Sequence, residues 1–280
     1  MEGNFFRRPI FWSSLLLILL WIAVFSLPDQ KLHLVFCDVG QGDAILVSYK
    51  QNQILIDGGP DNRVLSCLGH HLPFWDRKIE MIVLTHPEAD QFTGLIDVIK
   101  RYSVNYFVSN NLTNKGSAFQ ELQQEILKKN VLTHAPQEGE EIKIGALEFL
   151  VLWPPKDFYD SETNNSSVVL KLVFNQFTAL LTGDLSDKFE NQLDLTSVEV
   201  LKVAHHGSQT STSQTFLEKL KPRLAIISVG KNNFGQPSPE ILERLNNLKI
   251  RTLRTDQNGE IEIVSDGERW YTRVHGSGPN

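Results

Sequence analysis

Leu84-Thr-His-Pro-Glu-Ala-Asp-Gln-Phe-Thr-Gly94 follows directly on an apolar segment whose composition predicts a buried strand. The stretch carries an imidazole and two carboxylates at alternating positions, namely His86, Glu88 and Asp90. This spacing aims the three side chains at a common point beyond the end of the strand. Nitrogen and oxygen ligands of this kind bind divalent cations. The stretch therefore predicts a metal site, with Gln91 as a weaker, neutral oxygen ligand beside it.

Four further loops that are rich in ligands or glycine also follow apolar segments. They are Asp38-Val-Gly-Gln-Gly-Asp43, Asp57-Gly58-Gly59, Thr182-Gly183-Asp184 and His205-His206-Gly207-Ser208. A capped turn or a structural histidine explains any one of them. We expect five such loops after five apolar strands to meet at one edge of the sheets. A carboxylate there can bridge two ions through its two oxygens, whereas two neighbouring histidines point to different sides.

Predicted strands and strand–helix units alternate along the chain, and the pattern occurs twice. This order suits two sheets packed together with helices outside, an α+β fold of the four-layer αββα type. The last part, Ile250 to Val274, is predicted to form a hairpin or meander with turns at Asn258-Gly259 and Asp266-Gly267. The predicted helices are Asn62 to His71, Phe92 to Tyr102, Ala118 to Lys129, Ser211 to Leu220 and Pro239 to Leu248.

The composition is that of an ordinary globular protein of 280 residues, with a net charge of −6. Any contact with nucleic acid must therefore come from a local patch rather than from overall charge. The basic residues near the predicted site are Lys202, Lys219, Lys221 and Arg223. They mildly favour a phosphate-bearing substrate, although such residues usually form a solvated face. The two cysteines, Cys37 and Cys67, are interpreted as small buried apolar residues in preference to a disulfide.

The N-terminal segment predicts a membrane anchor. Ile10 to Leu27 contains no charged residue, and Arg7 and Arg8 precede it. Its length approaches the roughly 20 residues that a bilayer core requires, and the arginines place the N-terminus in the cytoplasm. A cleaved signal peptide is the rival interpretation, but the run does not end in the small residues of a cleavage site. We therefore expect residues 1–30 to be a cytoplasmic start and a transmembrane signal anchor, and residues 31–280 to be one extracellular domain.

The five loops, taken in order, resemble the metallo-β-lactamase superfamily, and in detail the extracellular domain of the competence protein ComEC. The motifs that carry the resemblance are Asp38-Val-Gly-Gln-Gly-Asp43-Ala, Asp57-Gly-Gly, Leu84-Thr-His-Pro-Glu-Ala-Asp, Leu181-Thr-Gly-Asp184, Lys202-Val-Ala-His-His-Gly-Ser208 and Ser228-Val-Gly-Lys-Asn-Asn-Phe-Gly-Gln-Pro-Ser238. The resemblance runs from about Leu32 to Val274. It implies an αββα sandwich with one or two divalent metal ions, Mn²⁺, Mg²⁺ or Zn²⁺, at the sheet edge.

The resemblance also implies roles for single residues. His86, Glu88 and Asp184 would serve one metal ion, and Asp90, Asp184 and one of His205 or His206 would serve the other. Asp90, Asp184 and His206 would be the catalytic residues. Asn165 matches a position where this branch often has Asn in place of a histidine, and Asp57 matches a supporting position. Asp38, Asp43, Gln91, Ser208 and Gln236 complete the weaker set.

The chain departs from the family pattern at three positions. Glu88 stands where the branch usually has Asp, and Gln91 and Gln236 stand where it usually has His. A glutamine offers a neutral carbonyl oxygen, which suits Mg²⁺ or Mn²⁺ better than Zn²⁺. These changes leave open a one-metal enzyme, a Mn²⁺ or Mg²⁺ enzyme, and a binding protein without catalysis.

The sequence thus predicts a membrane-anchored, metal-dependent hydrolase, a phosphodiesterase or nuclease that acts on extracellular DNA during DNA uptake. The alternatives are a catalytically impaired DNA- or partner-binding module and a hydrolase of small esters or lactones, since the fold does not fix the substrate. One predicted span cannot conduct DNA, so a separate membrane channel is an expected partner.

Overall fold

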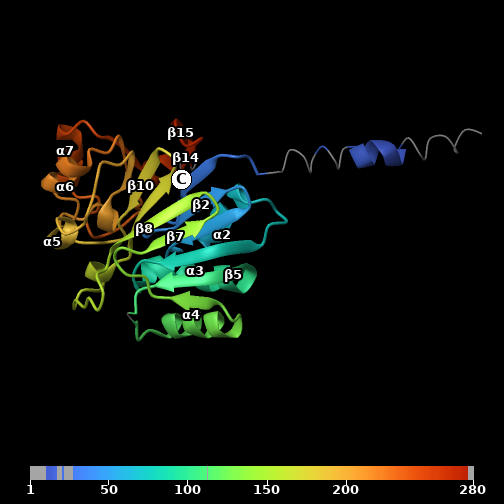
Figure 1. Ribbon diagram of the computed structural model, residues 1–280, viewed down its shortest axis with the longest axis horizontal. Coiled ribbons are helices and arrows are strands. Elements are labelled where there is room, and N and C mark those ends of the chain that lie inside the picture. The colour runs from blue at the N-terminus through green and yellow to red at the C-terminus, as the bar shows by residue number, and fades with distance from the viewer. Residues whose placement is uncertain (1–10, 18–20, 22–27, 112, 277–280) are drawn as a thin grey trace, which may run out of the picture.

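A computed structural model describes residues 11–17, 21, 28–111 and 113–276 of the chain. Residues 28–111 and 113–276 form two β-sheets that pack face to face, with helices on the two outer sides (Figure 1). The predicted α+β arrangement of layers is therefore confirmed.

The first sheet has eight strands in the spatial order β15-β14-β1-β2-β3-β4-β5-β6. Their bounds are β1 Leu32–Phe36, β2 Ile45–Tyr49, β3 Asn52–Ile56, β4 Lys78–Leu84, β5 Ser103–Ser109, β6 Leu132–His134, β14 Glu260–Ser265 and β15 Trp270–His275. Strands β3 to β6 run parallel, whereas β15, β14, β1, β2 and β3 pair antiparallel. The strand β1 consequently runs in the same direction as β3 and β4.

The second sheet has seven strands in the order β13-β12-β11-β10-β9-β8-β7. Their bounds are β7 Glu141–Ile144, β8 Leu147–Trp153, β9 Val169–Phe174, β10 Phe177–Leu181, β11 Val200–Lys202, β12 Leu224–Ile227 and β13 Arg251–Arg254. Strands β10 to β13 run parallel, so their carboxyl ends meet at one edge.

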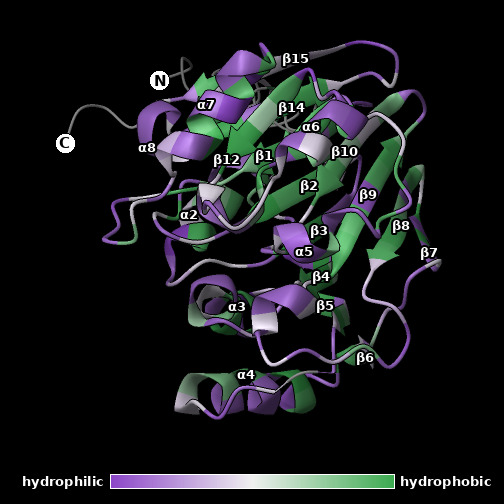
Figure 2. Ribbon diagram, turned by 90° about the vertical axis from the view of Figure 1, so that its left-hand side faces the viewer, coloured by the Kyte–Doolittle hydropathy of each residue, from purple (hydrophilic) through white to green (hydrophobic). Residues whose placement is uncertain are grey.

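Six helices and two short 3₁₀ segments border the candidate site or cover the sheets. Their bounds are α2 Arg63–His71, α3 Ala89–Arg101, α4 Ser117–Lys128, η1 Thr163–Ser166, α5 Asp187–Glu190, η2 Ala204–Gly207, α6 Gln214–Leu220 and α7 Pro239–Asn247. Helices α2 to α4 lie on one side of the strands and α5 to α7 on the other (Figure 1). The strands are mostly apolar and the outward helix faces mostly polar (Figure 2).

Alternation of side chains along each strand builds three apolar layers. In β1, Leu34 and Phe36 contribute to the core between the sheets, while Val35 packs in the layer beneath α2 and α3. In β12, Ile226 faces the other sheet and Ile227 packs in the layer with α6 and α7. Each sheet therefore buries both faces, which explains the nearly continuous apolar runs in the sequence.

The C-terminal part corrects one prediction. Ile250 to Val274 is not a single meander: β13 pairs parallel with β12 in the second sheet, and β14 and β15 form a hairpin in the first sheet. A short helix, α8 Thr255–Asn258, separates them, and Gly259 ends this helix with a left-handed φ of 68°. The reason is that β13 follows α7, so it completes a parallel strand–helix–strand unit with β12. The predicted turn at Asp266-Gly267 does join β14 to β15.

The cysteines correct a second prediction. Cys37 and Cys67 form a disulfide, although the sequence pattern favoured two unlinked residues. Cys37 follows β1 and Cys67 lies on α2, which packs on the same face of the sheet. Their Cα atoms are 5.8 Å apart, a normal separation for a disulfide.

The predicted anchor, Ile10 to Leu27, lies largely outside the described residues. Residues 11–17 are helical, and Trp12 and Leu16 are 64% and 59% exposed. Within the described ranges, no helix has the length and apolar character needed to cross a bilayer.

Candidate metal centre

The carboxyl ends of five strands bring the predicted loops together at one edge of both sheets. Asp43 and Asp57 come from loops beside β1, β2 and β3, and His86 follows β4. Asp184 follows β10 and His206 follows β11 in the second sheet. The site therefore straddles the two sheets, because parallel strands end at the same edge and the two sheets are packed face to face.

Asp184 lies at the centre of the group. Its Oδ2 is 3.5 Å from His206 Nε2 and 3.8 Å from His86 Nε2. Both histidines and Asp184 are at most 2% exposed. Burial opposes ionisation of Asp184, but the charges of His206, Lys202 and His86 lower the pKa of its carboxyl below the ordinary value. Asp184 is therefore an ionised carboxylate facing two imidazoles.

Asp90, in the first turn of α3, lies beside His206 at the edge of this group. Its Oδ2 is 3.2 Å from His206 Nε2, and its side chain is 31% exposed, so it faces the opening of the site. The sequence placed Asp90 in a loop, but α3 begins at Ala89. An acidic side chain in the first turn suits the positive end of the helix dipole. Gly42 allows the loop that carries Asp43 to lie close to the start of α3, because a Cβ at position 42 would collide with the Asp90 carbonyl.

A relay of hydrogen bonds orients His86. The Thr85 hydroxyl donates to Asp57 Oδ2 at 2.9 Å and lies 3.0 Å from His86 Nδ1. The Thr85 backbone N–H donates to the other Asp57 oxygen. Burial and the neighbouring Asp43 carboxylate raise the pKa of Asp57 well above its ordinary value. The relay leaves His86 Nε2 facing Asp184, as expected for a metal-binding histidine.

His206 is oriented in the same way from the second sheet. Its Nδ1 lies 2.9 Å from the Ser228 carbonyl, to which it donates, so Nε2 faces Asp90 and Asp184. Both His205 and His206 have left-handed φ values, 50° and 52°, that are unusual for histidine. Burial disfavours the His206 imidazolium, but Asp184, Asp43 and the hydrogen bond to Asp90 outweigh it and raise the pKa of His206 to about 9.

Several buried atoms at this site lack a hydrogen-bond partner among the described residues, and they include His86 Nε2, Gln91 Oε1, Asp184 Oδ1 and both Asp43 oxygens. Lys202 Nζ forms ion pairs with two of them, at 2.7 Å from Asp43 Oδ2 and 3.5 Å from Asp184 Oδ1. Buried polar atoms are normally paired, so orphaned ones suggest an unfilled ligand position. Asp43, Asp184 and His206 also offer ligand atoms that lie within 4.8 Å of one another. The donor set of nitrogen and oxygen atoms therefore fits a divalent cation.

The structure does not bring every predicted residue to this point. Glu88 Oε1 instead accepts a hydrogen bond from Thr163 at 2.5 Å. His205 contacts Asn164 at 3.5 Å, whereas Asn165 accepts from Ser186. Asn164 is thus the asparagine that contacts His205, and Asn165 is hydrogen-bonded to Ser186.

The remaining weaker candidates support neighbouring loops. Gln236 accepts from Gln41 at 2.7 Å and donates to the His205 carbonyl. Ser208 contacts Thr210, and Asp38 accepts from the Gly40 backbone. Gln91 belongs to the group itself, since its amide nitrogen lies 3.4 Å from His206 Nε2.

Sequence reasoning missed the role of two side chains. Lys202 is 1% exposed and ion-paired to Asp43, so it does not belong to a solvated face. A charged residue inside the apolar segment Val198 to Val203 was the available signal. Ser167 is the second such residue: its hydroxyl accepts a hydrogen bond from the Asp184 backbone N–H and lies 3.4 Å from His86 Nδ1.

Comparison with known proteins agrees with this geometry. The family model "Metallo-beta-lactamase superfamily" matches residues 37–231. The chain is 32% identical over 252 residues to ComE operon protein 3 of Bacillus subtilis (strain 168), covering 80% of this chain and 32% of that protein. It is 29% identical to Recombination protein 2 of Haemophilus influenzae, covering 85% and 31%. The chain thus spans about a third of these relatives.

Solved structures share the fold at low sequence identity. The metallo-beta-lactamase fold protein YhfI from Bacillus subtilis has a TM-score of 0.58 at 13% identity, covering 82% of this chain and 99% of that one. A diphosphatase from the PhnP family has a TM-score of 0.51 at 17% identity, covering 84% and 98%. The fold implies binding of a divalent metal ion. With its matched domain, its two sheets and its competence-related relatives, this chain belongs to the metallo-beta-lactamase superfamily.

Proposed function

We propose that this protein is a metal-dependent phosphodiesterase that cleaves DNA outside the cytoplasm, in a role related to DNA uptake. The observation that carries the proposal is the orphaned set of buried ligand atoms on His86, Asp184 and Gln91. A site that had lost its cation would be expected to pair these atoms or fill with apolar side chains. Gln91 in particular keeps a buried amide oxygen that has no hydrogen-bond partner among the described residues.

The residues divide into holding and reacting groups. His86, Asp184 and His206 would hold the cation, and Gln91 would add a weak oxygen ligand. A divalent cation held there supplies Lewis acidity toward water and toward a phosphoryl oxygen. Asp90 is the partly exposed carboxylate of the group, so we assign to it the acceptance of the proton from the attacking water. Thr85 and Ser228 fix the two imidazoles, which removes the need to reorganise the site during reaction.

Support for a nucleic-acid substrate comes from the relatives and from one side chain. Two relatives are named as competence-operon or competence proteins, ComE operon protein 3 and Competence protein ComA of Neisseria gonorrhoeae, the latter at 26% identity. Phe234 is 77% exposed in the loop whose Gln236 contacts the His205 backbone. An exposed aromatic ring beside the site is suited to stack on a nucleic-acid base.

The proposed location outside the cytoplasm has two supports. The Cys37–Cys67 disulfide is typical of oxidising compartments. The uncharged run Ile10 to Leu27 would anchor the chain, and its helical residues 11–17 expose aromatic and apolar side chains. Protection of the C-terminal domain from protease added to the cytoplasmic side of membranes would test this arrangement.

The function is tested by measuring metal content and Mn²⁺-, Mg²⁺- or Zn²⁺-dependent cleavage of single- and double-stranded DNA by the purified full chain. Asp184→Asn, which keeps the size of the side chain, should lose metal and cleavage while the circular dichroism spectrum is retained. Metal binding without cleavage of DNA, in the presence of ester cleavage, would favour a hydrolase of small esters. Absence of both metal and cleavage would favour a binding module.

A further inference from the structure

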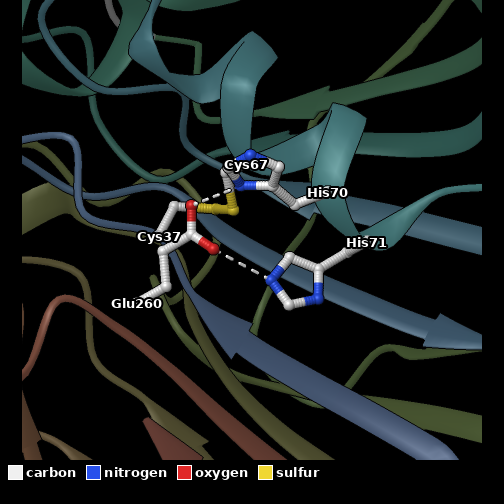
Figure 3. Close-up of a disulfide and its surroundings, with 5 residues drawn as sticks. All are labelled: Cys37, Cys67, His70, His71 and Glu260. Carbon is white, nitrogen blue, oxygen red and sulfur yellow. Dashed lines mark hydrogen bonds and ion pairs between the residues drawn. A yellow bond between two sulfur atoms is a disulfide. The ribbon is translucent and has the colours of Figure 1, made fainter. Parts of the chain in front are cut away.

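A second group of metal-ligand side chains surrounds the disulfide, outside the candidate metal centre. Cys67 and His71 are four residues apart on α2, so they lie on the same face of that helix. Glu260 opens β14 and meets this face from the neighbouring strand. Figure 3 shows the Glu260 carboxylate between the His70 and His71 rings, beside the Cys37–Cys67 bond.

The distances in this group resemble those between ligands of one ion. His71 Nε2 is 3.1 Å from Glu260 Oε2, and ligand atoms of Cys67, His71 and Glu260 all lie within 4.8 Å of one another. Ligands of a tetrahedral zinc ion at bond lengths of roughly 2.0–2.3 Å are separated by about 3.3–3.7 Å. A small movement of the Cys67 side chain would therefore complete the site.

A cavity gives this group access to solvent. Its volume is about 1150 Å³, and its wall includes His70, His71 and Glu260. His71 and Glu260 are 11% and 14% exposed, whereas Cys67 is 1% exposed. The cavity thus reaches the ligands that lie directly over the buried sulfur.

The disulfide determines whether the third ligand exists. A sulfur atom that is bonded to Cys37 is not a thiolate, and the thiolate is the form that binds metal. In the oxidised protein, His71 and Glu260 therefore offer only two of the three donors. Reduction would supply the third without a change of fold, because Cys67 is held in place by α2.

We propose that Cys67, His71 and Glu260 form a divalent-metal site, suited to Zn²⁺, when the Cys37–Cys67 disulfide is reduced. A dithiol gives two electrons and two protons to the disulfide, becomes a disulfide itself and leaves two cysteine thiols. Binding of the cation then displaces the proton of the Cys67 thiol. Because the cation binds only the reduced form, it stabilises that form and favours reduction.

Cobalt binding to the full chain tests the proposal, since a Co²⁺–thiolate bond gives an intense near-ultraviolet charge-transfer band. The candidate catalytic centre contains no cysteine, and the chain has only two, so this band reports the second site alone. We expect the band in dithiol-reduced protein and in Cys37→Ser, and its loss on reoxidation of the wild type. Asp184→Asn should leave it unchanged, which separates this test from that of the proposed function.

Matched variants show which side chains bind. Cys67→Ser should lose the band, and His71→Gln and Glu260→Gln should each weaken Co²⁺ affinity at least about tenfold. His70→Gln should leave the Co²⁺ affinity within about twofold of that of the reduced wild type. The proposal is overturned if reduced wild type and Cys37→Ser show no band at saturating Co²⁺, or if the band survives both His71→Gln and Glu260→Gln. Reduced wild type keeps the test valid should Cys37→Ser fail to fold.

Discussion

The Lys202 ammonium lies 2.7 Å from the Asp43 carboxylate, and both side chains are at most 1% exposed. Lys202 ends β11 of the second sheet and Asp43 precedes β2 of the first, so the ion pair joins the two sheets beneath the metal centre. Burial lowers the pKa of Lys202, but the carboxylates of Asp43 and Asp184 outweigh it and raise the pKa above its ordinary value. Lys202 is therefore charged, and it competes with a cation for Asp43.

This pair predicts a large stability effect. Lys202→Met removes the ammonium that is ion-paired to the buried Asp43 carboxylate and should lower the free energy of unfolding by about 3–5 kcal/mol. Urea denaturation followed by circular dichroism measures the loss. The double variant Asp43→Asn/Lys202→Met removes both charges of the pair and should recover part of it. An equal decrease in the free energy of unfolding in the single and double variants would contradict an energetic coupling between Asp43 and Lys202.

Replacing Gln91 tests why the site departs from the family pattern. Gln91 is fully buried, its oxygen is unpaired among the described residues, and its nitrogen lies 3.4 Å from His206. Gln91→His should raise the metal content toward two ions per chain and shift preference toward Zn²⁺, because imidazole is a better zinc ligand than an amide oxygen. Elemental analysis of protein loaded with each metal measures the change. Gln41→His, at a position that contacts Gln236, is a control that should leave metal content unaltered.

The raised pKa of His206, about 9, predicts a proton linkage. Below about pH 9 the metal-free imidazole is protonated, but a metal ligand must be neutral, so binding releases a proton. Apparent metal affinity should therefore rise with pH up to about 9, by as much as tenfold per unit. Calorimetric titration in buffers of different ionisation enthalpy counts the protons. Affinity that is constant between about pH 6 and pH 8 would show that His206 is not a ligand.

Phe234 predicts an effect on substrate binding alone. Its side chain is 77% exposed, and a phenyl ring offers no ligand atom to a metal ion. Base stacking on an aromatic ring contributes about 1–3 kcal/mol, so Phe234→Ala should raise KM for single-stranded DNA by about 5- to 150-fold with kcat and metal content unchanged. Phe234→Trp should restore binding. Steady-state cleavage of a labelled oligonucleotide gives both constants, and an unchanged KM would remove Phe234 from the substrate surface.

Much of the fold and half of the site follow from local patterns. Apolar runs with a strand period, each ending in a polar or glycine-rich loop, predict His86, Asp90, Asp184 and His206 at one edge of the sheets. The helix boundaries differ from the predicted ones by three residues or fewer. Local patterns succeed here because strand ends and helix starts are set by neighbours in the sequence.

Other features depended on residues that are distant in the sequence. Cys37 and Cys67 are 30 residues apart, and only the packing of α2 on β1 brings them together. The same holds for β13, whose partner strand is chosen by the crossover through α7. Glu88 has the right chemistry and spacing, yet the start of α3 one residue later turns it toward Thr163.

The sequence by itself determined the order of strands and helices, the family and the kinds of ligand at the strand ends, because periodicity and turn chemistry are local. Tertiary structure alone decided that Lys202 is buried against Asp43, that Asn164 contacts His205, and that the cysteines are joined. The physical reason is that a side chain's partner depends on which surfaces the packed sheets and helices press together, and a one-dimensional pattern does not contain that information.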